Sequence, residues 1–327
     1  MLLPWTCLAL LASSLGLAAA QDAPEIKSIP LRTHSLQPPY LDSDMQSRWF
    51  DFGGDTVVRT DKYIRLTADK GSRSGWLFSR VPLTATNWEV EVEFKIHGSG
   101  NLYGDGMALW LTKQRAQQGP VFGSVDKFEG LGIFFDTYKN NRPGVVFPYV
   151  MAMLGDGQTG YDKNTDGKAQ ELAGCSKGKK QARGLRNAAI PTKAKLTYFA
   201  EKSLKLELQY KSENDWIECF TVTDVKIPPV AYLGFSSETG ELADNHDIIS
   251  LSTKNLYQPS AAGVDGQPPK DRGRARAQKL SAQQRKKQAE GGGWLWFLFK
   301  FLLFGMVLAG AYVGFTAYRT QRMRSRF

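Results

Sequence analysis

The stretch Gly130–Asn141 reads GLGIFFDTYKNN, and it joins an apolar strand directly to a cluster of oxygen donors. Asp136 and Asn140 supply side-chain oxygens, and Tyr138 between them supplies a backbone carbonyl. Donors at alternate positions suit a hard cation with about six to eight oxygen ligands, which in proteins indicates calcium. Asp and Asn also favour plain turns. The stretch alone therefore leaves two interpretations open, a calcium loop and a turn.

Short strands and polar turns surround this stretch on both sides. From Asn87 to Ile96 apolar and charged residues alternate strictly, which predicts a half-buried antiparallel strand. Ala200–Ser203 reads as a hairpin turn, whereas residues 21–48 read as a loop, and no convincing amphipathic helix precedes residue 270. The pattern predicts an all-β sandwich. The other expected strands are Gly106–Thr112, Leu131–Phe135, Val145–Met153, Ala194–Ala200, Lys205–Tyr210, Trp216–Phe220, Ala231–Ser236 and His246–Leu256.

The net charge of +10 lies at one end of the chain. From Ser260 onward there are 13 Lys and Arg against three Asp and Glu, so residues 1–259 hold 29 of each. A neutral body lacks the basic surface that nucleic-acid binding requires. We therefore expect no nucleic-acid partner.

Two apolar segments flank the body. Residues 1–20 are apolar and end in three alanines, which fits cleavage by signal peptidase before Gln21. Residues 294–318 carry one charge, Lys300, and include the charge-free run Phe301–Tyr318. A bilayer core requires about 20 helical residues. The second segment is therefore predicted to be a single transmembrane helix.

These segments divide the chain into five expected parts. They are a signal peptide at 1–20, a lumenal domain at 21–257, a basic stalk containing Pro, Gly and Gln at 258–293, a transmembrane helix at 294–318 and a cytosolic tail at 319–327. A signal peptide with one later span predicts a single-pass type I membrane protein. The stalk shows no heptad repeat, so the sequence does not support oligomerisation through it.

Cysteine usage agrees with a lumenal body. Cys7 leaves with the signal peptide, so Cys175 and Cys219 remain as a pair in an oxidising compartment. A disulfide between them is the default expectation. Two isolated thiols without a nearby histidine do not make a zinc site.

Glu89, Glu91 and Glu93 form a row of carboxylates on one strand face. Glucanases of sandwich fold place their catalytic carboxylates in this way, and a retaining mechanism needs two of them about 5 Å apart. The alternative is a solvated face opposite an apolar one. The strict alternation, without a bulge, favours the solvated face, and a sandwich-fold glycoside hydrolase stays as the less favoured function.

Three polar segments are candidate binding elements. Asp105 lies between two glycines at a strand start, where its carboxylate can accept hydrogen bonds from vicinal hydroxyls or simply form a turn. The turn Tyr161–Gly167 carries two carboxylates and can complete a cation site with Asp136. It is not an EF-hand loop, because Ala173 stands where the bidentate Glu is required. The loop Gly240–Leu242 offers backbone N–H groups to hydroxyls, or is a surface turn.

Four motifs occur in one order along the chain: GPVFGS at 119–124, the stretch at 130–140, ELAGC at 171–175 and DNHD at 244–247. Together they resemble the L-type, legume-like cargo lectins of the early secretory pathway. The resemblance covers about residues 28–257. It implies a concanavalin-like (legume-lectin) jelly-roll sandwich, followed here by the short stalk and the single transmembrane helix.

The resemblance also implies a site. The cofactor would be Ca²⁺, held by Asp136, the Tyr138 carbonyl, Asn140 and Asp166. The carbohydrate would be held by Ser72, Asp105, Asn140, Gly240, Glu241 and Leu242. The Cys175–Cys219 pair matches the family disulfide, and Asp105 would follow a non-proline cis peptide at Gly104–Asp105.

Two positions depart from the family pattern. The family has His where Lys163 stands and commonly has Asp or Gly where Glu241 stands. Lys163 can donate to a sugar hydroxyl, but it cannot stack or accept a hydrogen bond as imidazole does. The departures therefore bear on sugar affinity and on the preferred mannose linkage.

The function implied by the resemblance is that of a calcium-dependent cargo lectin, not an enzyme. It would bind high-mannose N-glycans on secretory glycoproteins and act in ER–Golgi transport or quality control, in the membranes of the ER, the ER–Golgi intermediate compartment and the Golgi. The Arg-rich tail, Arg322–Phe327, would contact vesicle coat machinery, although it lacks the Lys-Lys pair of such tails. The alternative, kept open by Lys163, is a lectin-fold cargo adaptor with lost or altered sugar binding.

Overall fold

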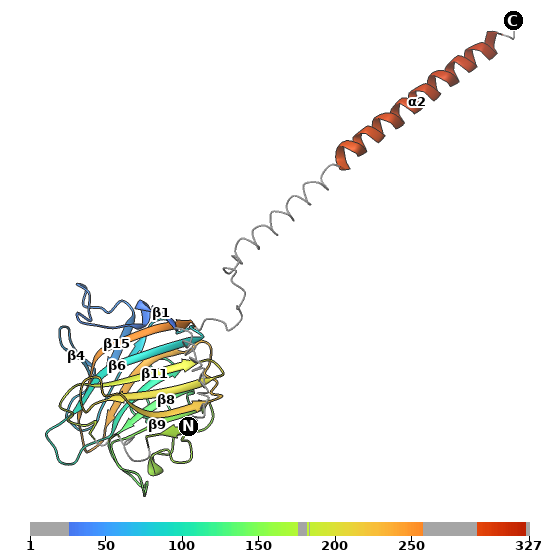
Figure 1. The fold of residues 1–327 in the computed structure, drawn as a ribbon. Coiled ribbons are helices and arrows are strands. Elements are labelled where there is room, and N and C mark those ends of the chain that lie inside the picture. The colour runs from blue at the N-terminus through green and yellow to red at the C-terminus, as the bar shows by residue number, and fades with distance from the viewer. Residues whose placement is uncertain (1–25, 176–181, 183, 258–292, 325–327) are drawn as a thin grey trace, which may run out of the picture. The chain divides into compact units, whose positions relative to one another are not determined.

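The structure, a computed structural model, describes residues 26–175, 182, 184–257 and 293–324 (Figure 1). The chain divides into two units, one ending at Pro259 and one beginning at Ser260. The first is built from two antiparallel β-sheets. The second contains one described helix.

The larger sheet has eight strands, in the order β13-β12-β11-β6-β15-β4-β3, with β1 paired to β15. Figure 1 shows β6, β15 and β11 side by side in this sheet. Its strands are β1 (Lys27–Pro30), β3 (Val57–Arg59), β4 (Tyr63–Thr67), β6 (Asn87–His97), β11 (Thr192–Phe199), β12 (Ser203–Gln209), β13 (Ile217–Thr223) and β15 (Asn245–Tyr257).

The smaller sheet has seven strands, in the order β10-β9-β8-β7-β14-β5-β2. Non-consecutive neighbours, such as β7 beside β14, are the mark of a jelly-roll rather than a simple meander. Its strands are β2 (Phe50–Gly54), β5 (Arg73–Ser79), β7 (Gly106–Thr112), β8 (Glu129–Asp136), β9 (Tyr149–Asp156), β10 (Ala173–Gly174) and β14 (Tyr232–Thr239). The predicted all-β sandwich is therefore confirmed.

The two sheets differ in how their faces are buried. In β6 buried and half-buried residues alternate, as the period-2 pattern predicts. In β7 every residue is buried, because its inner side chains join the core between the sheets and its outer ones join a second, aromatic layer. This aromatic layer includes Trp110, Phe122, Phe134 and Tyr161. The loops that cover it carry the candidate site.

A disulfide joins Cys175, directly after β10, to Cys219 in β13. These strands are the edge strands of the two sheets, so the bond ties one sheet to the other. It closes a loop of 44 residues, and in the chain-entropy model such a loop contributes on the order of 4 kcal/mol. The expected pairing is present in the structure.

Several elements differ from expectation, and β2, β3, β4, β5 and β10 were not among the strands predicted by their bounds. Residues 27–30 form β1, which pairs with β15, rather than the expected loop. The sequence did not predict this edge strand, because four residues are too few to show a periodic pattern. Strand β9 begins at Tyr149 rather than Val145, because Pro148 before it has no N–H to donate to a neighbouring strand. The hairpin at Ala200–Ser203 is confirmed by the pairing of Phe199 with Ser203. In the described part before β15 the helices are two short 3-10 turns, η1 (Arg32–His34) and η2 (Lys163–Thr165).

The second unit contains helix α2 (Gly293–Arg324). Within it, Trp296–Thr320 is long and apolar enough to cross a membrane. The helix continues past Tyr318, where the span was expected to end, because residues 319–324 are mostly good helix formers. The expected signal peptide, almost all of the stalk and the last three residues of the tail lie outside the described residues.

Candidate functional site

A cavity of about 150 Å³ lies at one end of the smaller sheet. In the strand register Gly106 at the start of β7 pairs with Asp136 at the end of β8 and with Glu238 near the end of β14. Three carboxylates, those of Asp105, Asp136 and Glu238, therefore meet at this end. The cavity is lined by Asp105, Phe122, Asp136, Tyr138, Asn140, Tyr161, Lys163 and Glu238.

Asp105 is held by its own backbone. The Gly104–Asp105 peptide bond is cis, as expected. The Asp105 amide donates to the Glu238 carbonyl at 3.2 Å, and the Asp105 carbonyl accepts from the Thr137 amide at 3.0 Å. Burial raises the pKa of the Asp105 carboxyl, the charge of Glu238 raises it further, and Lys163 acts in the opposite direction.

The predicted cation loop is assembled around two buried carboxylates. Asp136 is 5% exposed and accepts a hydrogen bond from the Tyr138 amide at 3.0 Å. Asp166 is 1% exposed and accepts one from the Asn140 side-chain nitrogen at 2.7 Å. Burial, and then the charge of Asp166, raise the pKa of Asp136 well above its usual value. The loop Asp136–Asn140 is thereby joined to the turn after η2.

This donor set fits calcium better than a transition metal. Within the described residues no three His, Cys, Asp or Glu side chains form a metal cluster. The predicted ligands here are two carboxylates, one amide and one backbone carbonyl, all of them oxygen donors that calcium accepts. A divalent cation would also offset the repulsion between the buried Asp136 and Asp166. Of the two carboxylates in the 161–167 turn, Asp162 instead caps η2 by accepting from the Asn164 amide.

The loop after β14 reaches the same place. The Ser72 amide donates to the Gly240 carbonyl at 2.8 Å. A Cβ added at Gly240 would lie 3.4 Å from an Asp105 carboxylate oxygen, so the Gly240 backbone lies beside that carboxylate. Glu241, which is exposed, and Leu242 follow in the same loop but are not among the residues that line the cavity. The structure thus brings Ser72, Asp105 and Gly240 together.

Lys163 and Glu238 form an ion pair inside the cavity, with Nζ 3.1 Å from Oε2. Glu238 was not predicted as a site residue, and neither were the aromatic residues Phe122 and Tyr161. A signal for Glu238 existed, because it is a carboxylate two residues before the Gly240 loop. Its partner could not be read from the sequence, since the two residues are 75 positions apart.

The motif Asp244–Asp247 supports the loops of the site. Asp244 is fully buried and holds Arg186, whose guanidinium also donates to the Gly100 carbonyl. Asn245 accepts from the Asp69 amide. This motif therefore fixes the loop before Asp105 and the loop before Ser72.

His246, also in this motif, begins a buried polar chain. Its Nδ1 lies 2.7 Å from the Thr67 hydroxyl, which lies 3.0 Å from the Ser237 hydroxyl. Ser237 donates to the Gly106 carbonyl at 2.8 Å, directly after Asp105. This buried polar chain of hydrogen bonds crosses from the larger sheet to the smaller one and ends at the site.

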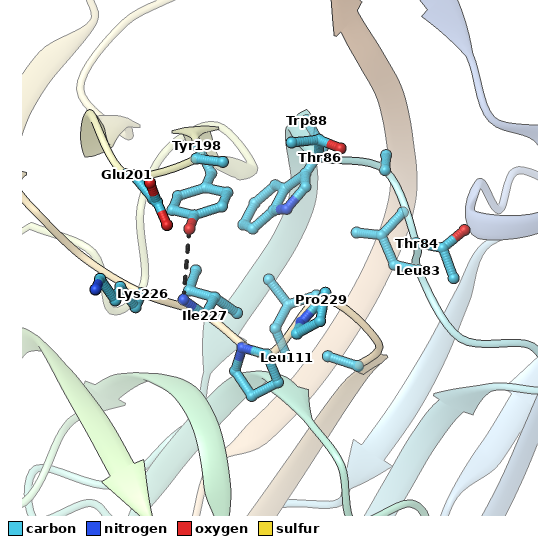
Figure 2. A pocket seen from close by; sticks show the side chains of 14 residues that line it. Leu83, Thr84, Thr86, Trp88, Leu111, Tyr198, Glu201, Lys226, Ile227 and Pro229 are labelled. Atoms are coloured by element: carbon cyan, nitrogen blue, oxygen red, sulfur yellow. Dashed lines mark hydrogen bonds between the residues drawn. The ribbon is translucent and has the colours of Figure 1, made fainter.

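A second cavity, of about 280 Å³, lies at the opposite end of the smaller sheet, near Leu111 and Ala231 (Figure 2). Figure 2 shows the Trp88 and Tyr198 rings side by side in it, and their centroids are 5.3 Å apart. The Tyr198 hydroxyl donates to the Val225 carbonyl. The lining is otherwise mainly apolar and lacks convergent carboxylates. The first cavity, which has them, is therefore the candidate binding site.

The glutamate row has ordinary cross-strand partners. Glu89 accepts from the Lys254 ammonium at 3.0 Å, and Glu93 accepts from the Ser250 hydroxyl at 3.1 Å. Glu91 stands opposite Lys195 in the register. These contacts are those of a solvated sheet face.

Comparison with known proteins decides the family. Residues 27–263 match the Legume-like lectin family. The chain belongs to this family. Lectins bind carbohydrate and are not enzymes, so the hydrolase alternative is set aside.

Individual relatives of this lectin support the same family assignment. It is 40% identical over 224 residues to an L-type lectin-like domain-containing protein of Schizosaccharomyces pombe, covering 68% of this chain and 70% of that one. It is 43% identical over 231 residues to the human VIP36-like protein, covering 69% of this chain and 64% of that relative's length.

Among solved structures, the lectin matches the VIP36 exoplasmic/lumenal domain in its Ca²⁺/Man2-bound form. The TM-score is 0.65 at 38% identity, and the match covers 73% of this chain and 94% of the other. That domain has also been solved in Ca²⁺-bound and Ca²⁺/Man-bound forms. Relatives of this chain are named as vesicular integral-membrane proteins.

Proposed function

We propose that this chain is a calcium-dependent lectin for mannose-containing glycans. The observation that carries the proposal is the position of the Asp105 carboxylate, which lies in one cavity with the Asn140 loop. Asp136, the Tyr138 carbonyl, Asn140 and Asp166 would hold the cation.

The sugar would be bound by complementary donors and acceptors. The Asp105 carboxylate accepts hydrogen bonds from hydroxyls, since it has about four lone-pair sites. The Asn140 nitrogen carries two N–H groups; one donates to Asp166 and the other is left for a hydroxyl. Ser72 and the loop Gly240–Leu242 would complete the site through backbone and side-chain groups. Calcium, when bound, would fix the Asn140 loop in place.

The test measures binding of the purified full chain to a glycan array in calcium and in excess chelator. We expect binding to oligomannose glycans that is lost in chelator. Asp105→Asn keeps the shape of the side chain but removes the charge, and we expect it to weaken binding about 10- to 100-fold, because hydrogen bonds to a charged group contribute about 1.5–3 kcal/mol. The matched control is Asp51→Asn, a carboxylate of the same sheet outside the cavity. Binding that survives both chelator and Asp105→Asn would contradict the proposal.

We further propose that α2 anchors the lectin domain in membranes of the ER, the ER–Golgi intermediate compartment and the Golgi. There it would carry high-mannose glycoproteins and contact coat machinery through its tail. The apolar segment Trp296–Thr320 and the vesicular relatives support this role. The test is carbonate extraction followed by protease protection of microsomes. We expect the lectin domain to be membrane-bound and protected, and release by carbonate would contradict the anchor.

A second candidate is a cargo adaptor of lectin fold that does not bind sugar. The Lys163–Glu238 ion pair supports it, because two of the groups that line the cavity are already paired with each other. The same glycan array separates the two candidates. Absence of binding to every glycan in calcium would favour the adaptor.

A further inference from the structure

Arg142 is a buried cation directly beyond the cation loop. It lies two residues after Asn140, and it is 5% exposed. Its Nη1 donates to the Asp166 carbonyl at 2.8 Å, and its Nη2 forms an ion pair with the Glu171 carboxylate. One guanidinium therefore holds the backbone of a predicted calcium ligand together with a carboxylate from another segment.

Glu171 is fixed in turn by β9. The Tyr149 hydroxyl, at the start of β9, donates to the Glu171 carboxylate at 3.0 Å. The Arg142 guanidinium lies over the Tyr149 ring, 4.5 Å from its centroid. Glu171 also opens the motif ELAGC, whose β10 residues pair with β9. The Arg142–Glu171 pair thus ties the turn after η2 to a strand of the smaller sheet.

The Asp166 backbone is in an uncommon conformation. Its φ of 51° lies in the left-handed region, which few residues other than glycine adopt. Such a conformation persists where the surrounding structure enforces it. The Asp166 side chain accepts from Asn140 and its carbonyl accepts from Arg142, so contacts on both sides hold the residue in place.

Neither stability nor sugar contact explains the Arg142–Glu171 pair. A buried ion pair is weak evidence for stability, because the cost of removing two charges from water can exceed their attraction. Neither residue is among those that line the cavity of the candidate site. The pair has no net charge, so it adds no net repulsion toward a bound cation.

We infer that Arg142 and Glu171 are positioning residues for the calcium site, which hold Asp166 beside the loop Asp136–Asn140. This inference rests on the proposed calcium-dependent function and deepens it, because it assigns a role to two residues outside the predicted ligand set. It predicts that calcium affinity depends on the geometry of the pair rather than on its charge.

The experiment is a calorimetric titration of the full chain in detergent with calcium, in the absence of sugar. Arg142→Lys keeps the charge but loses the planar group that reaches two acceptors. We expect this variant to bind calcium about 10- to 100-fold more weakly than the natural chain, the range for residues that orient metal ligands.

Arg142→Gln separates position from charge. It removes a positive charge near the cation, so electrostatics alone would tighten calcium binding. Loss of positioning would weaken it, and we expect binding about tenfold weaker or more. The double variant Arg142→Gln with Glu171→Gln leaves no buried charge unpaired, which favours folding. We expect it to lose about as much affinity as Arg142→Gln alone, because the two residues act as one unit.

The matched control is Arg115→Gln. Arg115 also holds a backbone carbonyl, that of Ser79, and a carboxylate, that of Asp51, but it lies beyond the other end of β7. It should keep calcium affinity within about twofold of the natural value, since it shares no partner with the cation loop. Thermal melting of each variant in chelator reports the effect on the fold alone.

The outcomes separate this inference from the proposed function. A natural chain that binds no calcium contradicts the proposed function and this inference with it. A natural chain that binds calcium, with unchanged calcium affinity in Arg142→Lys and in the double variant, contradicts this inference alone, however much these variants are destabilised. So does an Arg142→Gln variant that binds calcium more tightly, because the pair would then act through charge only.

Discussion

At the scale of single residues, the site depends on carboxylates whose charge is set by their neighbours. Asp136 is buried and Asp105 is half-buried, and burial raises the pKa of each. The Lys163 ammonium acts on Asp105 in the opposite direction. Replacing Lys163 therefore changes the charge balance of the cavity as well as the contacts at its rim.

His246 provides a prediction about pH. Burial lowers its pKa from 6.5 to about 3, against the smaller opposing effect of Asp247. A base whose pKa is lower in the folded state binds protons mainly when unfolded, so stability falls as pH drops from 6.5 toward 3. From pH 7 to pH 5 we expect a loss of about 2 kcal/mol from this group.

The measurement is denaturant unfolding of the natural chain and of His246→Gln at pH 7 and pH 5. Glutamine keeps a polar group but does not titrate, so the variant should lose less stability between the two pH values. The raised pKa of Asp136 acts in the opposite direction and is common to both chains. Equal losses in the two proteins would contradict the prediction.

At the scale of elements, the site lies where β7 begins and the neighbouring strands β8 and β14 end. The antiparallel register places Gly106, Asp136 and Glu238 side by side, so residues from three separate segments line one cavity. The polar chain from Thr67 through Ser237 ties this end of the smaller sheet to β4 of the larger one.

Ser237→Ala tests that polar chain. The Gly106 carbonyl would lose its side-chain donor, and we expect a stability loss of about 1–3 kcal/mol. Because Gly106 follows Asp105, we also expect sugar affinity to fall about threefold to tenfold. The measurements are thermal melting and calorimetry.

Ser79→Ala is the control for Ser237→Ala. Ser79 is equally buried and accepts a hydrogen bond from the Leu233 amide, away from the cavity. It should destabilise the protein to a similar degree without weakening sugar binding. A Ser237→Ala variant with unchanged sugar affinity would show that the buried polar chain has only a structural role.

The sequence predicts a strand well where apolar and polar residues alternate over many positions. The alternation over Asn87–Ile96 predicts β6, and the hairpin residues predict β11 and β12. Strands β1, β2, β3, β4, β5 and β10 were not predicted individually, because most of them have five residues or fewer and show little periodicity. The start of β9 was placed too early, because Pro148 before it has no N–H for strand pairing.

For the site, residues that lie close in sequence were the predictable ones. The loop Asp136–Asn140 carries its donors within five residues, so its spacing is visible. The contact between Lys163 and Glu238 exists only through the tertiary register. Phe122 lies in the motif at 119–124 and Tyr161 opens the polar turn at 161–167, but neither was predicted as a site residue, and only the fold shows that both line the cavity.

At the scale of the whole molecule, a lectin unit is joined in sequence to an apolar helix. We expect a single site of this kind to bind weakly, and presentation of many copies on one surface raises the affinity by effective concentration. If α2 anchors the chain, the membrane provides that surface. Affinity then depends on copy density as well as on the site.

This dependence can be measured on vesicles that carry the full chain at increasing density. We expect the apparent affinity for a mannose-bearing polymer to rise about 100-fold or more with density, whereas the affinity for methyl α-mannoside stays constant. Asp105→Asn vesicles are the control, since at equal density their affinity for both ligands should be about 10- to 100-fold weaker. A polymer affinity that does not change with density would contradict the prediction.

The aromatic layer on the outer face of the smaller sheet has an optical consequence. The Trp110 indole donates to the Ser236 hydroxyl at 2.7 Å, and that hydroxyl donates to the carbonyl of Phe122, a residue of the cavity wall. Indole emission responds to its hydrogen bonding, so filling the cavity should shift the fluorescence of this buried tryptophan. Trp110→Phe should remove the shift. We therefore predict an intrinsic reporter of cavity occupancy, with which calcium and sugar would be titrated without a label.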